Sequence, residues 1–210
     1  MKRLAIIGSG DLGQQIAYYA ETDKQYKVVG FFDDFTPKGA LVKNIPVLGK
    51  IAEIEEAFNN NVFDVILIGI GYKHIEFKSN IYKKLKGVIP FGKLIHSSVI
   101  ADESAIIADG VVIYPGCLID AQVEIQENSL LNVAVTVAHD TKIGAHSFLS
   151  PRVALAGFCA VGEKNILGIN STVIDNITTV NNVQLGGGTV LINNIEKEGL
   201  YVGNPARFIR

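Results

Sequence analysis

Large aliphatic residues recur at every sixth position from Ile95 to Leu191. Only Ala101 and Thr179 break the aliphatic character of this series, and no insertion disturbs the count. The positions two residues earlier are nearly all small or β-branched. A helix has a period of 3.6 residues and a strand a period of two, so a sustained period of six fits neither alone. This spacing predicts a parallel β-helix, in which each short strand contributes one inward side chain before the chain turns a corner.

An ordinary β-sandwich with regular turns is the alternative architecture for this segment. It would let the spacing drift between strands, and the sequence shows no drift. We therefore expect hexapeptide repeats over residues 94–192, with three repeats of six residues forming one coil.

The N-terminal segment has a different pattern. Residues 3–7 form an apolar run suited to a buried parallel strand. Gly8–Gly13 matches G-x-G-x-x-G, residues 14–22 have helical composition, and residues 26–32 predict a second strand that ends in Asp33-Asp34. A strand, a glycine turn, a helix and a strand in this order indicate a Rossmann-type unit.

The remaining α/β elements follow in short segments, and all end near residue 90. The pattern predicts an extended piece at residues 46–49, helices at 51–59 and 73–86, and strands at 64–69 and 88–91. The expected fold class is thus α/β plus all-β. A Rossmann-like domain spans residues 1–92, and a β-helix domain with a C-terminal tail spans residues 93–210.

Composition narrows the functional classes. The chain has 210 residues, a net charge of −2 and a pI near 6.1, which gives no support for nucleic-acid binding. There is no apolar run of membrane-spanning length, and the first apolar run stops at a glycine turn, unlike a signal peptide. Cys117 and Cys159 fall on the small inward phase of the repeat, which predicts buried thiols in a reducing compartment. These features together predict a cytoplasmic location.

Three segments are expected to meet at the carboxyl edge of the parallel sheet: Gly8 with Gly10, Asp33 with Asp34, and Gly69 with Gly71. A glycine loop at a helix N-terminus suits phosphate. About 90 residues are too few for both halves of a dinucleotide fold, so we favour a nucleotide-linked ligand over NAD. A tight turn without a ligand is the simpler alternative. An NAD(P)-dependent oxidoreductase is another, although no Tyr-x-x-x-Lys pair stands in catalytic context.

His139 is the titratable residue of greatest interest. A lone histidine in a solenoid is usually a surface residue. His96 and His146 also occur in the repeat, and His74 in the predicted helix before it. Asp140 follows His139 and can orient it. Gly157 lies one 18-residue coil later, which predicts that its N–H stacks beside the imidazole and can bind an oxyanion. No further ligand recurs at the coil spacing near His139, so we expect no metal site.

The ordered motifs resemble the NeuD/PglD-type sugar N-acyltransferases, a branch of the hexapeptide acyltransferases. The resemblance covers essentially the whole chain: G-S-G, F-F-D-D and I-G-I-G, then L-N-x(6)-H-D-x-x-I-G, A-G, L-G-I-N-S, L-G-G-G and V-G-N-P-A-R. It implies a left-handed β-helix and a homotrimer. It also implies acetyl-CoA as co-substrate and a nucleotide-activated amino sugar as acceptor.

The resemblance assigns roles to individual residues. His139 is expected to be the general base, with Asp140 orienting it and Asn132 near the reacting groups. The residues expected to contact the sugar nucleotide are Gly8, Ser9, Gly10, Asp33, Asp34, Phe35, Gly69 and Gly71. The residues expected to contact acetyl-CoA are Gly157, Ile169, Gly187, Pro205, Ala206 and Arg207.

Three residues at two sites depart from the family pattern. Asp11-Leu12 replaces a glycine-histidine pair that relatives often carry after the first strand, and Phe148 replaces a histidine often found nine residues after the base. The expected function is acetyl-CoA-dependent N-acetylation of a nucleotide-linked 4-amino-4,6-dideoxy sugar for surface glycan assembly. The nucleotide (UDP, dTDP or GDP) stays open. The alternatives are a sugar O-acetyltransferase, of the kind that acts on sialic acid, and a non-catalytic solenoid.

Overall fold

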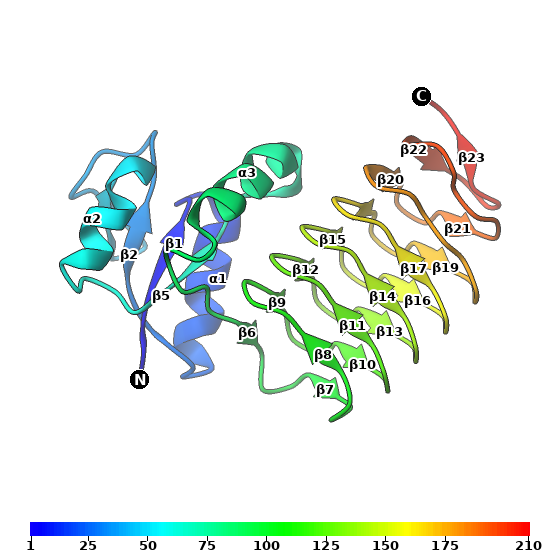
Figure 1. The fold of residues 1–210 in the computed structure, drawn as a ribbon, viewed down its shortest axis with the longest axis horizontal. Helices are drawn as coiled ribbons and strands as arrows, with labels where there is room; N and C mark the ends of the chain where they lie inside the picture. Colours follow the sequence, from blue (N-terminus) through cyan, green and yellow to red (C-terminus); the bar gives the residue numbers. More distant parts are fainter. The chain divides into compact units, whose positions relative to one another are not determined.

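The chain divides into two units, Met1–Leu94 and Ile95–Arg210, in a computed structural model that describes all 210 residues. The first unit is built on a five-stranded sheet in the order β3-β4-β2-β1-β5 (Figure 1). The strands are β1 (Arg3–Ile7), β2 (Lys27–Phe32), β3 (Leu41–Val42), β4 (Ile45–Gly49) and β5 (Val65–Ile68). All neighbouring pairs are parallel except β3 with β4. The predicted Rossmann-like order of elements is therefore present.

The helices predicted at residues 51–59 and 73–86 form with a short 3₁₀ turn at each start, and the first helix begins at Asp11, three residues before the predicted range. The helical elements are α1 (Asp11–Thr22), η1 (Ile51–Glu53), α2 (Ile54–Asn59), η2 (Tyr72–His74) and α3 (Ile75–Leu85). One hydrophobic cluster unites side chains of α2 and α3 with the strand residues Ala5, Ile7, Phe32, Ile66 and Ile68. Because side chains alternate along a strand, α2 and α3 cover one face of the sheet.

The strand predicted at residues 88–91 does not form. Only Phe91 bridges to Ile66, where the Ile66 N–H donates to the Pro90 carbonyl and the Gly92 N–H donates to the Ile66 carbonyl. Pro90 has no N–H to offer, so the ladder cannot extend through it. The prediction of a strand here was wrong.

Close packing of α1 on the sheet depends on two glycines. A Cβ atom at Gly13 would collide with the Gly8 carbonyl oxygen, and one at Gly69 would collide with the Gly13 Cα. The helix, the glycine loop and the end of β5 therefore approach each other at backbone distance. This brings the carboxyl ends of β1 and β5 together.

The second unit is a left-handed parallel β-helix of short strands, coil upon coil (Figure 1). Its strands form three sheets, which we call faces A, B and C in the order the chain visits them. Face A contains β6 (Leu94–Ile95), β9 (Val112–Ile113), β12 (Leu130–Leu131), β15 (Phe148–Leu149), β18 (Ile166–Leu167), β20 (Val183–Leu185), β22 (Gly199–Val202) and β23 (Arg207–Phe208). Face B contains β7 (Ile100–Ala101), β10 (Leu118–Ile119), β13 (Thr136–Val137), β16 (Ala154–Leu155), β19 (Thr172–Val173) and β21 (Val190–Leu191). Face C contains β8 (Ile106–Ile107), β11 (Glu124–Ile125), β14 (Lys142–Ile143) and β17 (Ala160–Val161).

The strand register confirms the coil length read from the repeat. Val137 pairs with Leu155, and Ile125 pairs with Ile143, each 18 residues apart in the sequence. Thr179, one of the two exceptions in the six-residue series, lies outside any named strand and forms only an isolated bridge to Ile195.

Left-handed backbone conformations recur at the corners with the same period. Every sixth residue from Gln122 to Asn182 has a positive φ, whatever its side chain: Gln122, Asn128, Ala134, Asp140, His146, Arg152, Phe158, Lys164, Asn170, Asn176 and Asn182. These corners turn the chain from one face to the next while the inward residues fill a single core.

The two cysteines lie in that core as free, buried thiols, as the repeat predicted. Burial raises the pKa of both thiols, to about 11 for Cys117. Neither residue is poised to act as a nucleophile at neutral pH, because the thiolate is the reactive form. No helix of the chain combines the length and apolar character needed to cross a membrane.

Candidate active site

The glycine loop after β1 is held in place by the carboxylate of Asp33. Asp33 Oδ2 accepts from the Ser9 N–H at 2.7 Å and from the Ser9 hydroxyl at 2.8 Å. Asp33 Oδ1 accepts from the N–H groups of Phe35 at 2.8 Å and Thr36 at 3.0 Å. Both carboxylate oxygens of Asp33 thus accept hydrogen bonds from the chain itself. Ser9, a residue of the glycine loop, is buried.

These hydrogen bonds decide the ionisation of Asp33. Burial opposes the charged form, but the hydrogen bonds from Ser9, Phe35 and Thr36 outweigh it and hold the pKa of Asp33 below its ordinary value. The charged carboxylate therefore ties the loop after β1 to the loop after β2.

Asp34 has a different arrangement. Its Oδ1 accepts from the Ile51 N–H at 3.0 Å, and its other oxygen has no partner in the chain. Of the acidic pair expected at a ribose, Asp34 is the residue with an oxygen available to a ligand.

A cavity of about 600 Å³ opens at the carboxyl edge of the sheet. Seven of the eight residues expected to contact the sugar nucleotide line it: Gly8, Gly10, Asp33, Asp34, Phe35, Gly69 and Gly71. Ser9 does not, because its side chain turns to Asp33. The sequence motifs did not indicate the other lining residues, which are Phe32, Ile51, Ile70, His74 and Phe77.

The missed residues follow a rule that the sequence contains. Ile51 comes directly after the loop that ends β4, and Ile70, His74 and Phe77 come after β5. Ligands of open α/β sheets bind outside the carboxyl ends of the strands, so the residues after every strand are candidates. A cavity with several apolar walls and a few polar groups is typical of small-molecule sites.

A second cavity of about 430 Å³ shares part of this lining. Its walls are Gly10, Asp11, Leu12, Gly69, Gly71, Tyr72, Lys73 and His74. Two of the residues that depart from the family pattern, Asp11 and Leu12, therefore lie on this cavity and not on the larger one.

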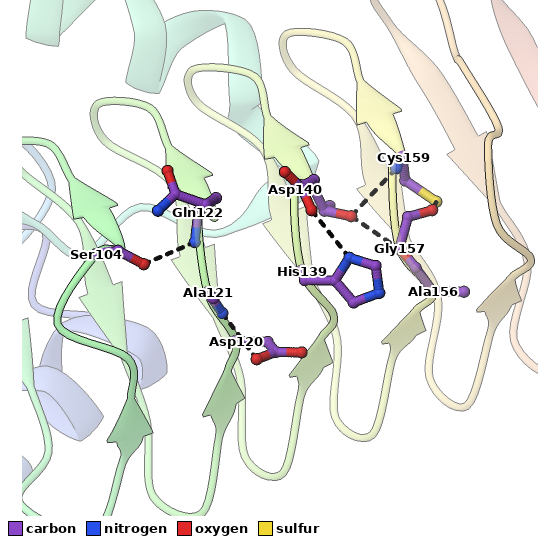
Figure 2. Close-up of polar contacts among 10 residues, drawn as sticks. Ser104, Asp120, Ala121, Gln122, His139, Asp140, Ala156, Gly157 and Cys159 are labelled. Carbon is purple, nitrogen blue, oxygen red and sulfur yellow. Dashed lines mark hydrogen bonds and ion pairs between the residues drawn. The ribbon is translucent and has the colours of Figure 1, made fainter.

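In the β-helix, His139 lies at the corner between faces B and C, after β13 (Figure 2). Its Nδ1 donates to Asp140 Oδ2 at 3.0 Å. A carboxylate oxygen only accepts, so Nδ1 carries the proton and Nε2 is left as the proton acceptor. About half of each side chain is exposed, so the imidazole is accessible. The Asp140 carboxylate thus holds the ring through this one hydrogen bond.

Gly157 occupies the equivalent corner one coil later, after β16 (Figure 2). A Cβ atom at Gly157 would lie 2.7 Å from His139 Cε1 and 2.9 Å from Nε2, inside the contact distance of real side chains. Its N–H makes no hydrogen bond within the chain, whereas the next amide, Phe158 N–H, donates to the His139 carbonyl at 3.1 Å. The Gly157 residue, with its N–H unengaged in the chain, thus lies against the imidazole.

Two neighbours of this corner were not anticipated. The Phe158 ring meets the His139 ring edge to face, with 5.1 Å between centroids and 86° between planes. Thr141 Oγ1 donates to the Ala156 carbonyl at 2.9 Å and accepts from the Cys159 N–H at 3.1 Å. The threonine ties the His139 coil to the Gly157 coil, and the phenylalanine forms a wall for the ring.

Other expected site residues lie at a different corner. Asn132, Ile169 and Gly187 are at the corner between faces A and B. The Asn132 side chain accepts from the Val133 N–H at 2.8 Å, and no hydrogen bond joins it to His139. Ile169 and Gly187 stack one coil apart, with the Gly188 N–H donating to the Ile169 carbonyl at 2.8 Å. Within one chain, face B separates this group from His139 and Gly157.

The remaining residues named from the sequence lie in the C-terminal tail and at Phe148. Ala206 packs against the β-helix core and donates its N–H to the Val190 carbonyl at 2.8 Å, between the exposed Pro205 and Arg207. Phe148 is buried in face A, away from the His139 corner.

Comparisons with known proteins agree with this architecture. Residues 3–85 match the family model of the PglD N-terminal domain. The chain is 34% identical over 73 residues to UDP-3-O-acylglucosamine N-acyltransferase of Bordetella pertussis (strain Tohama I), a match that covers 35% of this chain and 20% of the relative. The chain thus spans about a fifth of the length of the curated relatives it matches.

Solved structures resemble the whole chain. The acetyltransferase domain of PglB from Neisseria gonorrhoeae FA1090 superposes with a TM-score of 0.91 and 27% identity, covering 100% of both chains. PerB from Caulobacter crescentus, solved in complex with CoA and GDP-perosamine, gives a TM-score of 0.90 and 25% identity, covering 100% of this chain and 98% of that one. The family model over residues 3–85 and these two structures make the chain similar to PglD-type proteins and to solved sugar-acetyltransferase structures.

Proposed function

We propose that this protein transfers the acetyl group of acetyl-CoA to the amine of a nucleotide-linked 4-amino-4,6-dideoxy sugar. The observation that carries the proposal is the stacking of His139 over Gly157, which places a proton acceptor beside an unengaged N–H. The PglB domain solved with acetyl-CoA and PerB solved with CoA and GDP-perosamine support the choice of both substrates.

Each part of the corner has a role in acyl transfer. Acetyl-CoA supplies a thioester, whose carbonyl carbon the sugar amine attacks. His139 Nε2 takes the proton that the amine loses, and Asp140 stabilises the resulting imidazolium through Nδ1–H. The Gly157 N–H donates to the carbonyl oxygen as it gains negative charge. His139 then returns the proton to the CoA sulfur as the carbon–sulfur bond breaks, so no acyl-enzyme forms.

The first unit binds the acceptor in this scheme. The nucleotide lies in the 600 Å³ cavity, where the glycine loop faces phosphate and Asp34 offers a free oxygen. Asp33 acts as a positioning residue that shapes the loop, and Ser9 acts with it.

The expected homotrimer belongs to the same proposal. Of the residues assigned to acetyl-CoA, Gly157 lies at the B–C corner and Ile169 and Gly187 lie at the A–B corner, so face B separates them in one chain. A neighbouring copy that sets its A–B corner against this B–C corner would join Ile169 and Gly187 to Gly157. The cytoplasmic location and a role in surface glycan assembly are proposed with it, since both activated substrates are cytoplasmic metabolites.

His139→Ala tests the function. We expect wild-type protein to release CoA from acetyl-CoA with a UDP-, dTDP- or GDP-linked 4-amino-4,6-dideoxy sugar, and His139→Ala to lower turnover by roughly 100-fold or more. His96→Ala, at a histidine outside the corner, is the matched control and should retain turnover. Full activity in His139→Ala would reject the base. Activity with sialic acid and none with the amino sugars would replace N-acetylation by O-acetylation.

A further inference from the structure

His74 occupies a position that the proposed function leaves unused. It ends the turn η2, after β5, and lines both the 600 Å³ cavity and the neighbouring 430 Å³ cavity. The two cavities share His74, Gly10, Gly69 and Gly71. The imidazole is exposed and makes no hydrogen bond or ion pair within the chain, so both ring nitrogens are open to a ligand.

Charge is distributed unevenly around this position. His74 is the only side chain lining the larger cavity that can carry a positive charge, since the other ionisable residues there are Asp33 and Asp34. In the second cavity, Asp11 of the first turn of α1 and Lys73 also face this region. A ligand with negative charge at the shared boundary would meet backbone N–H groups of the glycine loop on one side and His74 on the other.

We propose that His74 binds the diphosphate of the nucleotide sugar at the boundary between the two cavities. The inference rests on the proposed function. The nucleoside then occupies the larger cavity, and the diphosphate spans Gly10 and His74. A protonated imidazole donates from either nitrogen to a phosphate oxygen, and such charge-assisted hydrogen bonds are stronger than neutral ones. Binding of the diphosphate therefore depends on the protonation of His74.

The test measures the affinity of UDP-glucose, dTDP-glucose and GDP-mannose by calorimetry at pH 6 and pH 8.5. Both phosphates of these probes are esterified, so each keeps one negative charge across this range and the titration reports the protein. We expect the best-bound probe to lose about tenfold in affinity from pH 6 to pH 8.5, because a neutral imidazole no longer makes a charge-assisted hydrogen bond to phosphate.

The variant His74→Gln tests whether the imidazole itself binds the diphosphate, as opposed to the overall charge of the cavity. It should bind that probe about tenfold more weakly than wild type at pH 6 and show no pH dependence. Lys73→Gln removes a fixed charge one residue away, so it should retain the wild-type pH dependence. If His74→Gln keeps both the wild-type affinity at pH 6 and its pH dependence, the inference is wrong. If wild-type protein binds none of the three probes, the proposed nucleotide-sugar site itself fails, and the inference fails with it.

Discussion

The contact between His139 and Gly157 depends on the absence of one carbon atom. The backbone at Gly157 is not in the left-handed region, so alanine is acceptable there except for its approach to the imidazole. The equivalent corner two coils earlier carries Ala121, on the coil before His139, so the fold itself accepts alanine at this corner. The identity of residue 157 is therefore set by the histidine and not by the fold.

Gly157→Ala should lower turnover while the fold persists. The new Cβ would push the imidazole away from its present position, and small misplacements of a catalytic group cost up to about 100-fold in rate. Steady-state kinetics should show a turnover at least about tenfold lower, with an unchanged circular dichroism spectrum. Ala121→Gly, the reverse change at the equivalent corner on the other side of the His139 coil, is the control and should keep wild-type turnover, because it adds no atom against the imidazole. Wild-type turnover in Gly157→Ala would show that the ring position is not critical.

Some residue-level features follow from the sequence and others do not. The 18-residue coil placed Gly157 beside His139 because the backbone repeat fixes which residues stack. The same repeat puts Asn132 at the A–B corner, one face before the B–C corner that holds His139. The resemblance to the family had grouped the two residues at one site. Nothing in the sequence says which of Asp33 and Asp34 turns toward the backbone, because both are acidic and adjacent. That choice depends on which N–H groups the folded loops present.

At the scale of elements, the loops after β1 and β2 are joined through one carboxylate. Because the folded pKa of Asp33 is depressed below its ordinary 3.8, the stabilisation it gives is fully present above about pH 3.8. It is lost as the pH falls through the lower, folded value. The loops should therefore separate in acid before the sheet itself needs to change.

Asp33→Asn should destabilise the first unit by about 1–3 kcal/mol at pH 7, because its amide nitrogen faces N–H donors that need an acceptor. The difference in melting temperature between wild type and Asp33→Asn should shrink as the pH is lowered below 3.8, since the wild-type carboxylate then also loses its charge. Asp34→Asn, whose carboxylate accepts one hydrogen bond from the chain, serves as the comparison and should change stability less. A difference that grows in acid would contradict the assignment.

The predictability of elements differs between the two units for a physical reason. In the β-helix, one inward side chain recurs with every six-residue unit of strand and corner in the backbone. The apolar spacing therefore predicted every coil. Within the series, only the polar Thr179 lies outside a strand. In the first unit, the apolar run at residues 88–91 resembled a strand, but Pro90 lacks the N–H that a ladder requires. The two-residue strand β3 was too short to produce any pattern.

At the scale of the whole molecule, the second unit is quasi-one-dimensional, since each coil pairs only with the coil before and the coil after it. Leu155 is 1% exposed and lies in the core beneath Gly157. Leu155→Ala should cost about 2–5 kcal/mol, because it removes buried carbon atoms and leaves a cavity.

Hydrogen exchange can locate that loss. Amides of β13, β16 and β19 should exchange faster in Leu155→Ala, while amides of the first unit keep their protection. Thr172→Ala changes an exposed, outward side chain on the same face and should leave the exchange pattern intact. Uniform loss of protection in both units would show that they unfold as one.

The corners with left-handed backbone have a consequence for how such proteins change over evolutionary time. Because these conformations recur every six residues with side chains as different as asparagine, arginine and phenylalanine, no particular residue type is needed to continue the winding. A gene duplication that adds one whole coil beyond the His139 and Gly157 corner leaves their alignment intact, whereas a single-residue deletion between them moves every later side chain to another orientation. The length of the solenoid is thus free to drift in whole turns, while the spacing from histidine to glycine is locked.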